Sequence, residues 1–253
     1  MGEVGTGGSR DEDPLWYESM PDDWSWACLW SGYVRCMCGG IRTINLEAQC
    51  SACGKAWVEV EPAPLVTRDT DGYELRVKPD LAGAEGRYED WVYLSMLERE
   101  WRRPVDAGLY GSVPENSRPS SRAIVVLLFW SYFETRIGRL FRETTKTVPG
   151  EVMDHLLERH SSVGARMDRL YRVVFSSTYR ADLNDLGYGH VASLLKQVEQ
   201  CRNKFTHGHP EAIDDALVEE LVAGLKEEHE AWIAVFNKRL RESRGQLARL
   251  NSK

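Results

Sequence analysis

The chain has 253 residues, of which 42% are hydrophobic, and a formal net charge of −7 at pH 7. This length predicts one or two domains, and the negative charge argues against a general nucleic-acid coat protein. The longest apolar run, residues 123–130, is far too short to span a bilayer, and no basic segment precedes an apolar one near the first residue. We therefore expect a cytoplasmic protein without membrane contact.

The beginning of the chain is strongly acidic. Residues 1–30 hold seven acidic side chains and one basic side chain, and residues 1–14 are rich in glycine. Such a composition does not form a core, so residues 1–25 are predicted to be an acidic, partly mobile arm. Two roles stay open for it, a disordered tail or a cover over a positively charged groove.

Five of the six cysteines lie between positions 28 and 53. Two pairs, each followed by glycine and separated by eleven residues, resemble the two knuckles of a zinc ribbon. The predicted zinc ligands are Cys36, Cys38, Cys50 and Cys53. Four thiolates fill the coordination sphere, so the zinc would be structural. The first pair has one intervening residue instead of two, which leaves Cys28 as an alternative ligand and metal-free reduced thiols as another interpretation.

The predicted ribbon covers residues 26–61. Short β-prone segments flank the cysteines, and Pro62 and Pro64 end the ribbon. The β-prone segments are residues 32–35, 41–46 and 56–60.

A connector is predicted for residues 62–120. Residues 73–77 alternate like a short strand, and apolar residues at three- and four-residue steps predict a helix over 87–102. Residues 106–120 contain glycine, proline, serine and asparagine, which indicates a linker.

The remaining part, residues 121–245, is predicted to be a bundle of four helices. An apolar stripe from Val126 to Phe141 marks the first helix, and similar stripes mark the other three. A turn with two glycines is expected at residues 182–189. The predicted helices cover residues 122–146, 150–178, 190–205 and 211–242.

The end of the third helix carries the sequence Arg202-Asn203-Lys204-Phe205-Thr206-His207, followed by Gly208. A guanidinium offers two parallel donors to a phosphate, and an imidazole, with a reference pKa of about 6.5, transfers protons near neutral pH. These two groups suffice for RNA cleavage without a metal. The alternative is a structural Arg202, since it lies beside the apolar stripe and needs a carboxylate or helix carbonyls as partners. Residues 121–205 carry thirteen basic and nine acidic side chains, as a phosphate-binding surface would favour.

At Arg202, Asn203 and His207 the chain resembles the HEPN superfamily, whose motif is an arginine followed by a histidine after four to six residues. The resemblance covers about half of the chain. It implies a HEPN-like four-helix bundle that dimerises and brings two Arg/His pairs into one cleft. By analogy with this family, the resemblance implies that His207 is the general acid or base and that Arg202 holds the scissile phosphate. It also implies that Asn203 orients His207 or contacts the phosphate. Glu134 is the candidate for a polar residue of the first helix that faces the site.

The fold class expected is therefore mainly α, with a C-terminal HEPN-like bundle after a small β-rich zinc ribbon and a connecting helix. The resemblance implies a metal-independent endoribonuclease that leaves a 2′,3′-cyclic phosphate, in the role of a toxin or phage-defence effector. Its expected partners are RNA, a second copy of the chain, and an antitoxin or regulatory protein. The alternatives are a non-catalytic HEPN-type module that binds nucleic acid or protein, and a DNA-binding ribbon with a dimerising bundle.

Overall fold

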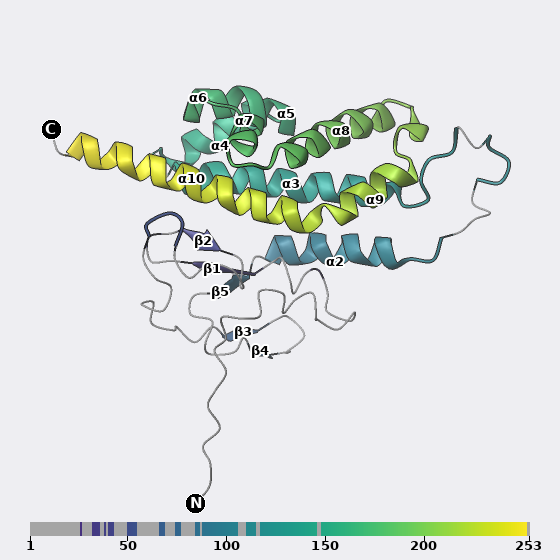
Figure 1. Cartoon of the computed structure of the whole chain (residues 1–253), viewed down its shortest axis with the longest axis horizontal. Helices are drawn as coiled ribbons and strands as arrows, with labels where there is room; N and C mark the ends of the chain where they lie inside the picture. Colours follow the sequence, from purple (N-terminus) through teal and green to yellow (C-terminus); the bar gives the residue numbers. More distant parts are fainter. Residues whose placement is uncertain are drawn as a thin grey trace, which may run out of the picture.

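The structure is a computed structural model, and most of its described residues are helical (Figure 1). The prediction of a mainly α protein is confirmed. The residues described are 26, 32–35, 38, 40–42, 50–54, 66–68, 74–76, 84–86, 88–105, 110–114, 117–145 and 148–251. The predicted arm 1–25, the strand 56–60, and the candidate ligands Cys28 and Cys36 lie outside these residues.

Helix α3 (Ala123–Thr144) lies at the centre of the helical part. Its apolar positions recur at helical spacing, and every residue of its predicted stripe is buried. Helix α2 (Tyr88–Arg102) runs alongside α3, and the guanidinium of Arg139 donates two hydrogen bonds of 2.6 and 2.8 Å to the carboxylate of Asp90. The predicted helices 87–102 and 122–146 are thus confirmed.

The second predicted helix, 150–178, is wrong as a single element. It is divided into α4 (Gly150–Arg159), α5 (Val163–Ala165), the π-helix η4 (Arg166–Leu170) and α6 (Tyr171–Phe175). The break follows from two side chains. The hydroxyl of Ser162 accepts a hydrogen bond from the N–H of Ala165, and the guanidinium of Arg166 donates to the carbonyl of His160.

The turn predicted at residues 182–189 is also wrong, because its first half is helical. Helix α7 (Tyr179–Asp185) begins where the hydroxyl of Thr178 accepts a hydrogen bond of 3.1 Å from the N–H of Ala181. Gly187, with φ of 89°, ends the segment after α7.

Helix α8 (Gly189–Thr206) matches the predicted third helix, whereas the predicted fourth helix, 211–242, is interrupted. It consists of the 3₁₀-helix η5 (Pro210–Ala212), α9 (Asp215–Ala223) and α10 (Leu225–Asn251). At Gly224 a Cβ atom would lie 2.9 Å from Cδ2 of Leu194, so α8 approaches the chain closely at this glycine.

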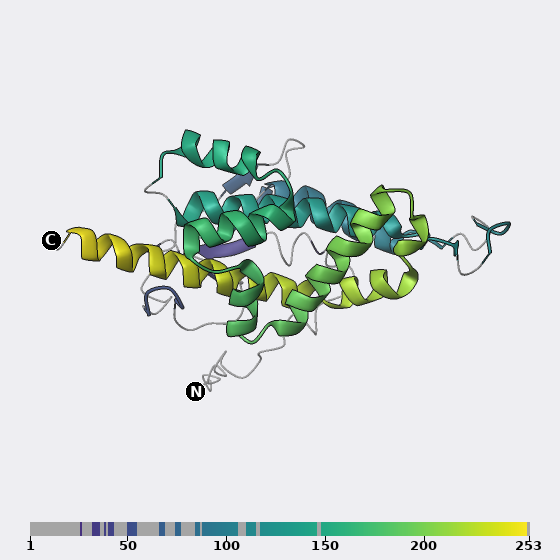
Figure 2. The same ribbon diagram turned by 90° about the horizontal axis from the view of Figure 1, so that it is seen from above.

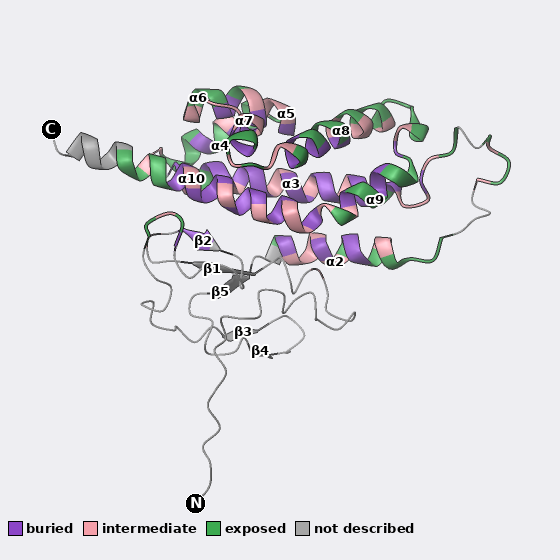
Figure 3. Cartoon of the chain, in the orientation of Figure 1, coloured by how far each residue is buried: buried purple, intermediate pink, exposed green. Residues whose placement is uncertain are grey.

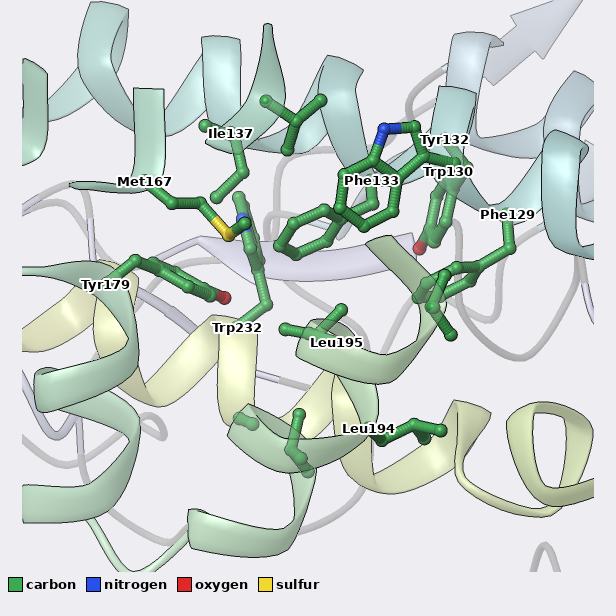
Figure 4. Close-up of a cluster of buried hydrophobic side chains, with 14 of the residues drawn as sticks. Phe129, Trp130, Tyr132, Phe133, Ile137, Met167, Tyr179, Leu194, Leu195 and Trp232 are labelled. Carbon is green, nitrogen blue, oxygen red and sulfur yellow. The ribbon is translucent and has the colours of Figure 1, made fainter. Parts of the chain in front are cut away.

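The helices enclose one apolar core, and their buried faces turn toward each other (Figure 3). Aromatic rings from α3, α7 and α10 fill it (Figure 4). The centroid of the Phe133 ring lies 5.8 Å from the centroid of the Trp130 ring and 5.7 Å from that of the Tyr179 ring. Viewed from above, α3 and α10 run in similar directions, with α8 and α9 at one end (Figure 2).

The strands lie at one side of this core. Strands β1 (Gly32–Arg35), β2 (Ile41–Arg42) and β5 (Ala84–Gly86) form an antiparallel sheet in the order β2-β1-β5. Strands β3 (Val66–Arg68) and β4 (Glu74–Arg76) form a separate pair. The predictions of strands at 32–35 and 73–77 are confirmed, but β5 was not predicted, and it extends the sheet beyond residue 61. In the part of the chain that the structure describes, no helix combines the length and apolar composition needed to cross a bilayer.

Candidate functional site

The Arg202–His207 motif occupies the end of α8, where the backbone N–H groups of residues 207–209 are hydrogen-bonded to carbonyls of the helix. The N–H of His209 donates to the carbonyl of Lys204 at 3.1 Å, and the N–H of Gly208 donates to the carbonyl of Phe205 at 3.3 Å. These two bonds form a Schellman motif, in which Gly208 takes the left-handed conformation with φ of 95°. His207 is therefore fixed as the last residue before the chain turns, and its side chain is exposed.

Arg202 is half-buried, as its place beside the apolar stripe predicts. Its Nη1 donates a hydrogen bond of 3.1 Å to Oδ1 of Asn203, the neighbouring motif residue. Across the described residues, no carboxylate forms an ion pair with Arg202. The alternative of a structural arginine held by an acidic partner is thus not supported within the described residues. Lys204, two residues further along the chain, is exposed and adds a second cation.

A single copy of α8 does not stack the two motif side chains on one face. Residues five apart on an α-helix are separated by about 140° around its axis. Among the described residues, no hydrogen bond joins the side chains of Arg202 and His207. One chain therefore presents the guanidinium and the imidazole as neighbours at a helix end, without direct contact.

The structure places Glu134 elsewhere. Its Oε1 accepts a hydrogen bond of 3.0 Å from Nη1 of Arg166, and both residues line a pocket of about 250 Å³ between α2, α3, α4 and η4. None of the bonds between described residues connects Glu134 with Arg202, Asn203 or His207. Its role in the motif site stays a prediction that one chain alone does not support.

The cysteine cluster forms a second candidate site. The sulfur atoms of Cys38, Cys50 and Cys53 all lie within 4.8 Å of one another, and Cys50 is buried. The Sγ atoms of Cys38 and Cys50 are 3.6 Å apart. This spacing suits three thiolates that share one ion.

The backbone around these sulfurs is shaped for such a cluster. At Gly40 a Cβ atom would lie 2.8 Å from Sγ of Cys50 and 3.3 Å from Sγ of Cys38. The N–H of Gly40 donates to Sγ of Cys38 at 3.3 Å, and Gly54 has φ of 75°. Burial raises the pKa of the Cys50 thiol well above its usual value. Burial alone thus favours the protonated thiol, and a bound cation would offset this effect; it is the grouping of the three sulfur atoms around Gly40 that fits a metal bound by thiolates.

Asn237 of α10 belongs to this region, and our sequence analysis did not single it out. Its Oδ1 accepts a hydrogen bond of 2.8 Å from the N–H of Ile41, and its Nδ2 donates to the carbonyl of Ile41 and to the hydroxyl of Ser51. The sequence signal is weak, since it consists of one amide among the apolar residues of α10.

The two candidate sites are far apart. Figure 1 and Figure 2 share their horizontal axis, and in both the cysteine knuckle lies on the side toward the C-terminal part of α10, whereas the end of α8 lies on the opposite side. Comparison of the chain with family models, with curated proteins and with solved structures found no match.

Proposed function

We propose that the protein is a metal-independent endoribonuclease that acts through Arg202 and His207. The observation that carries this proposal is the end of α8, where a Schellman motif presents an exposed imidazole and a half-buried guanidinium without an acidic partner among the described residues. The resemblance of this motif to the HEPN superfamily gives the reaction type.

In the proposed reaction, His207 takes the proton from a ribose 2′-hydroxyl or gives one to the leaving 5′-oxygen. Arg202 binds the phosphate and stabilises its developing charge. Asn203 keeps the guanidinium in place through its side-chain oxygen. The products are a 2′,3′-cyclic phosphate and a 5′-hydroxyl end, and no metal takes part in the chemistry.

The active form in this proposal is a homodimer. Because one helix separates the two side chains around its axis, a second copy is needed to bring an arginine and a histidine to opposite sides of one phosphate. The helical order α3, α4–α6, α8 and α9–α10 supports a HEPN-like bundle. A toxin or phage-defence role in the cytoplasm, controlled by an antitoxin or regulatory protein, belongs to the same proposal.

The cysteine cluster is proposed as a structural zinc site. Cys38, Cys50 and Cys53 would hold the ion together with Cys36 or Cys28, in the arrangement of a zinc ribbon. With four thiolates the metal has no open position, so it would supply stability and no catalytic chemistry.

The test of the proposed activity is cleavage of total RNA by the purified protein in EDTA, compared among single variants. His207→Ala and Arg202→Ala are each expected to reduce the cleavage rate at least about 100-fold, because the first removes the proton-transfer group and the second removes the group that stabilises the developing charge of the phosphate. The matched control is His209→Ala, which removes an exposed histidine of the same turn and leaves cleavage within about twofold. Cleavage by folded His207→Ala at the wild-type rate would overturn the proposal.

A second candidate function is a non-catalytic module that binds nucleic acid. It is favoured by the lack of direct contact between Arg202 and His207 and by the engagement of Glu134 with Arg166. The same experiment separates the two candidates. A binding module retains RNA in a complex that depends on Arg202, yet leaves the RNA uncut.

A further inference from the structure

Among the described residues, one side chain of α10, that of Asn237, forms hydrogen bonds with both cysteine knuckles. Asn237 is 1% exposed, and its carboxamide pairs with both the N–H and the carbonyl of Ile41. Its third bond, of 2.8 Å, joins Nδ2 to the hydroxyl of Ser51. Ile41 follows Gly40, whose N–H contacts Cys38, and Ser51 stands between Cys50 and Cys53. One amide therefore holds both segments that carry candidate metal ligands.

This contact is costly to open. Ile41 is 2% exposed and packs into the same core as α3 and α10. A buried backbone N–H and carbonyl that lose their partner without gaining water are strongly unfavourable. The two cysteine segments must consequently keep their hydrogen bonds to Asn237 of α10. A metal that fixes the distances between their sulfur atoms would hold the segments in the positions where these bonds form.

Helix α10 also binds the segment that leads into α8. Directly after Asn237, Lys238 donates to Oδ1 of Asp182 at 3.0 Å, and Arg239 binds the same carboxylate. Asp182 belongs to α7, which precedes α8. Residues 237–239 of α10 therefore hold the cysteine segments on one side and α7 on the other.

From this arrangement we propose that metal binding by the cysteine cluster is coupled, through Asn237, to the stability of the helical bundle. When the thiolates hold a metal ion, Ile41 and Ser51 are fixed in the positions that Asn237 binds, and α10 is stabilised. Without the metal the two segments separate from each other and from α10. The inference rests on the proposed zinc site and is independent of the proposed nuclease activity.

The experiment compares thermal unfolding of the full chain, followed by helical circular dichroism, with and without one equivalent of Zn²⁺. In the wild type, zinc is expected to raise the Tm by at least about 4 °C, since a ligand that binds only the folded state stabilises it. In Asn237→Ala, zinc still binds at one ion per chain by metal analysis, but the rise falls to less than about half. Cys201→Ser is the control, because this cysteine lies outside the cluster and its loss leaves the zinc response unchanged.

Ser51→Ala tests the same coupling if Asn237→Ala does not fold. Ser51 is exposed and its loss removes one of the three bonds, so the bundle persists while the zinc-dependent rise in Tm becomes smaller than in the wild type. An equal rise in wild type and in the Asn237 or Ser51 variant would overturn the coupling. So would a wild type that binds no zinc, or one that binds zinc without a change in Tm. RNA cleavage is not part of this readout, so the coupling and the nuclease proposal can fail separately.

Discussion

Asp182 is a buried acidic residue that joins three helices. Its carboxylate accepts hydrogen bonds from the hydroxyl of Tyr171 on α6 and from Lys238 and Arg239 on α10, and it is 1% exposed. Burial alone would raise the pKa of Asp182, but the hydrogen bonds from Tyr171, Arg239 and Lys238 together hold it below its usual value of 3.8. The ionised carboxylate is therefore part of what holds α7 to α10.

Because the pKa of Asp182 is lower in the folded state than in the unfolded state, ionised Asp182 stabilises the fold at neutral pH. The unfolded chain binds the proton of Asp182 near pH 3.8, whereas the folded chain binds it only at lower pH. The contribution of Asp182 is thus fully present above about pH 5 and is lost as the pH falls through 3.8 toward the folded pKa.

Asp182→Asn is expected to lower the free energy of unfolding at pH 7 by about 3–5 kcal/mol, because it removes the buried carboxylate that faces Arg239 and leaves this guanidinium, among the described residues, only the partly exposed Glu242 as an acidic partner. The deficit relative to wild type should shrink below pH 4, as measured by urea unfolding at several pH values. The matched control is Asp185→Asn. Asp185 is exposed and lies 3.5 Å from the same Lys238, so its loss should cost less than about 1 kcal/mol. Equal losses for the two variants would contradict this account.

Among the elements, α8 depends on two glycines of the same conformation at its two ends. Gly187 precedes it with φ of 89°, and Gly208 follows it with φ of 95°. At both positions a Cβ atom would have no neighbour within 4 Å. Any loss of stability when alanine replaces either glycine therefore comes from the left-handed backbone conformation alone.

Gly208→Ala and Gly187→Ala are expected to lower stability by a similar amount, about 1 kcal/mol each. Only Gly208→Ala should also slow RNA cleavage, by about tenfold or more, because the Schellman bonds of Gly208 and His209 fix the backbone of His207. Chemical denaturation and cleavage rates measure the two effects. A loss of cleavage that is equal in both variants would show that it reflects stability and not the position of His207.

The elements that could be predicted from the sequence are those whose apolar spacing is uninterrupted. The apolar stripes of α3 and α8 predict both helices correctly, because the apolar residues of each segment recur at helical spacing without interruption. The break after His160 depends on side-chain bonds of Ser162 and Arg166 to nearby backbone groups, and the interruption at Gly224 coincides with the approach of Leu194 from α8. Such contacts join residues that spacing alone cannot relate.

The candidate sites divide in the same way. The exposed His207 and half-buried Arg202 could be placed from the position of the motif at the end of an amphipathic helix. The grouping of Cys38, Cys50 and Cys53 could be inferred from cysteine spacing and glycine. Asn237 and the pairing of Glu134 with Arg166 could not, since each contact crosses between elements far apart in the chain.

In the molecule as a whole, α10 contacts the cysteine segments on one side and α7 on the other. Residues 237–239 make these contacts, while the motif of α8 lies on the side opposite to the cysteine knuckle along the long axis (Figure 1). In our account the cysteine region stabilises the bundle, and the end of α8 performs the chemistry when two copies meet. Removal of zinc should thus lower the stability of the bundle without directly changing Arg202 or His207.

The central claim is that cleavage uses the ribose 2′-hydroxyl and proceeds without a metal. The most direct measurement is end-group analysis of fragments from an RNA pool and from the same sequences with 2′-deoxyribose, each incubated with the protein in EDTA. The account predicts RNA fragments with 2′,3′-cyclic phosphate and 5′-hydroxyl ends, and an intact deoxyribose pool. Cleavage of both pools, fragments with 3′-hydroxyl and 5′-phosphate ends, or an RNA pool left intact would contradict it.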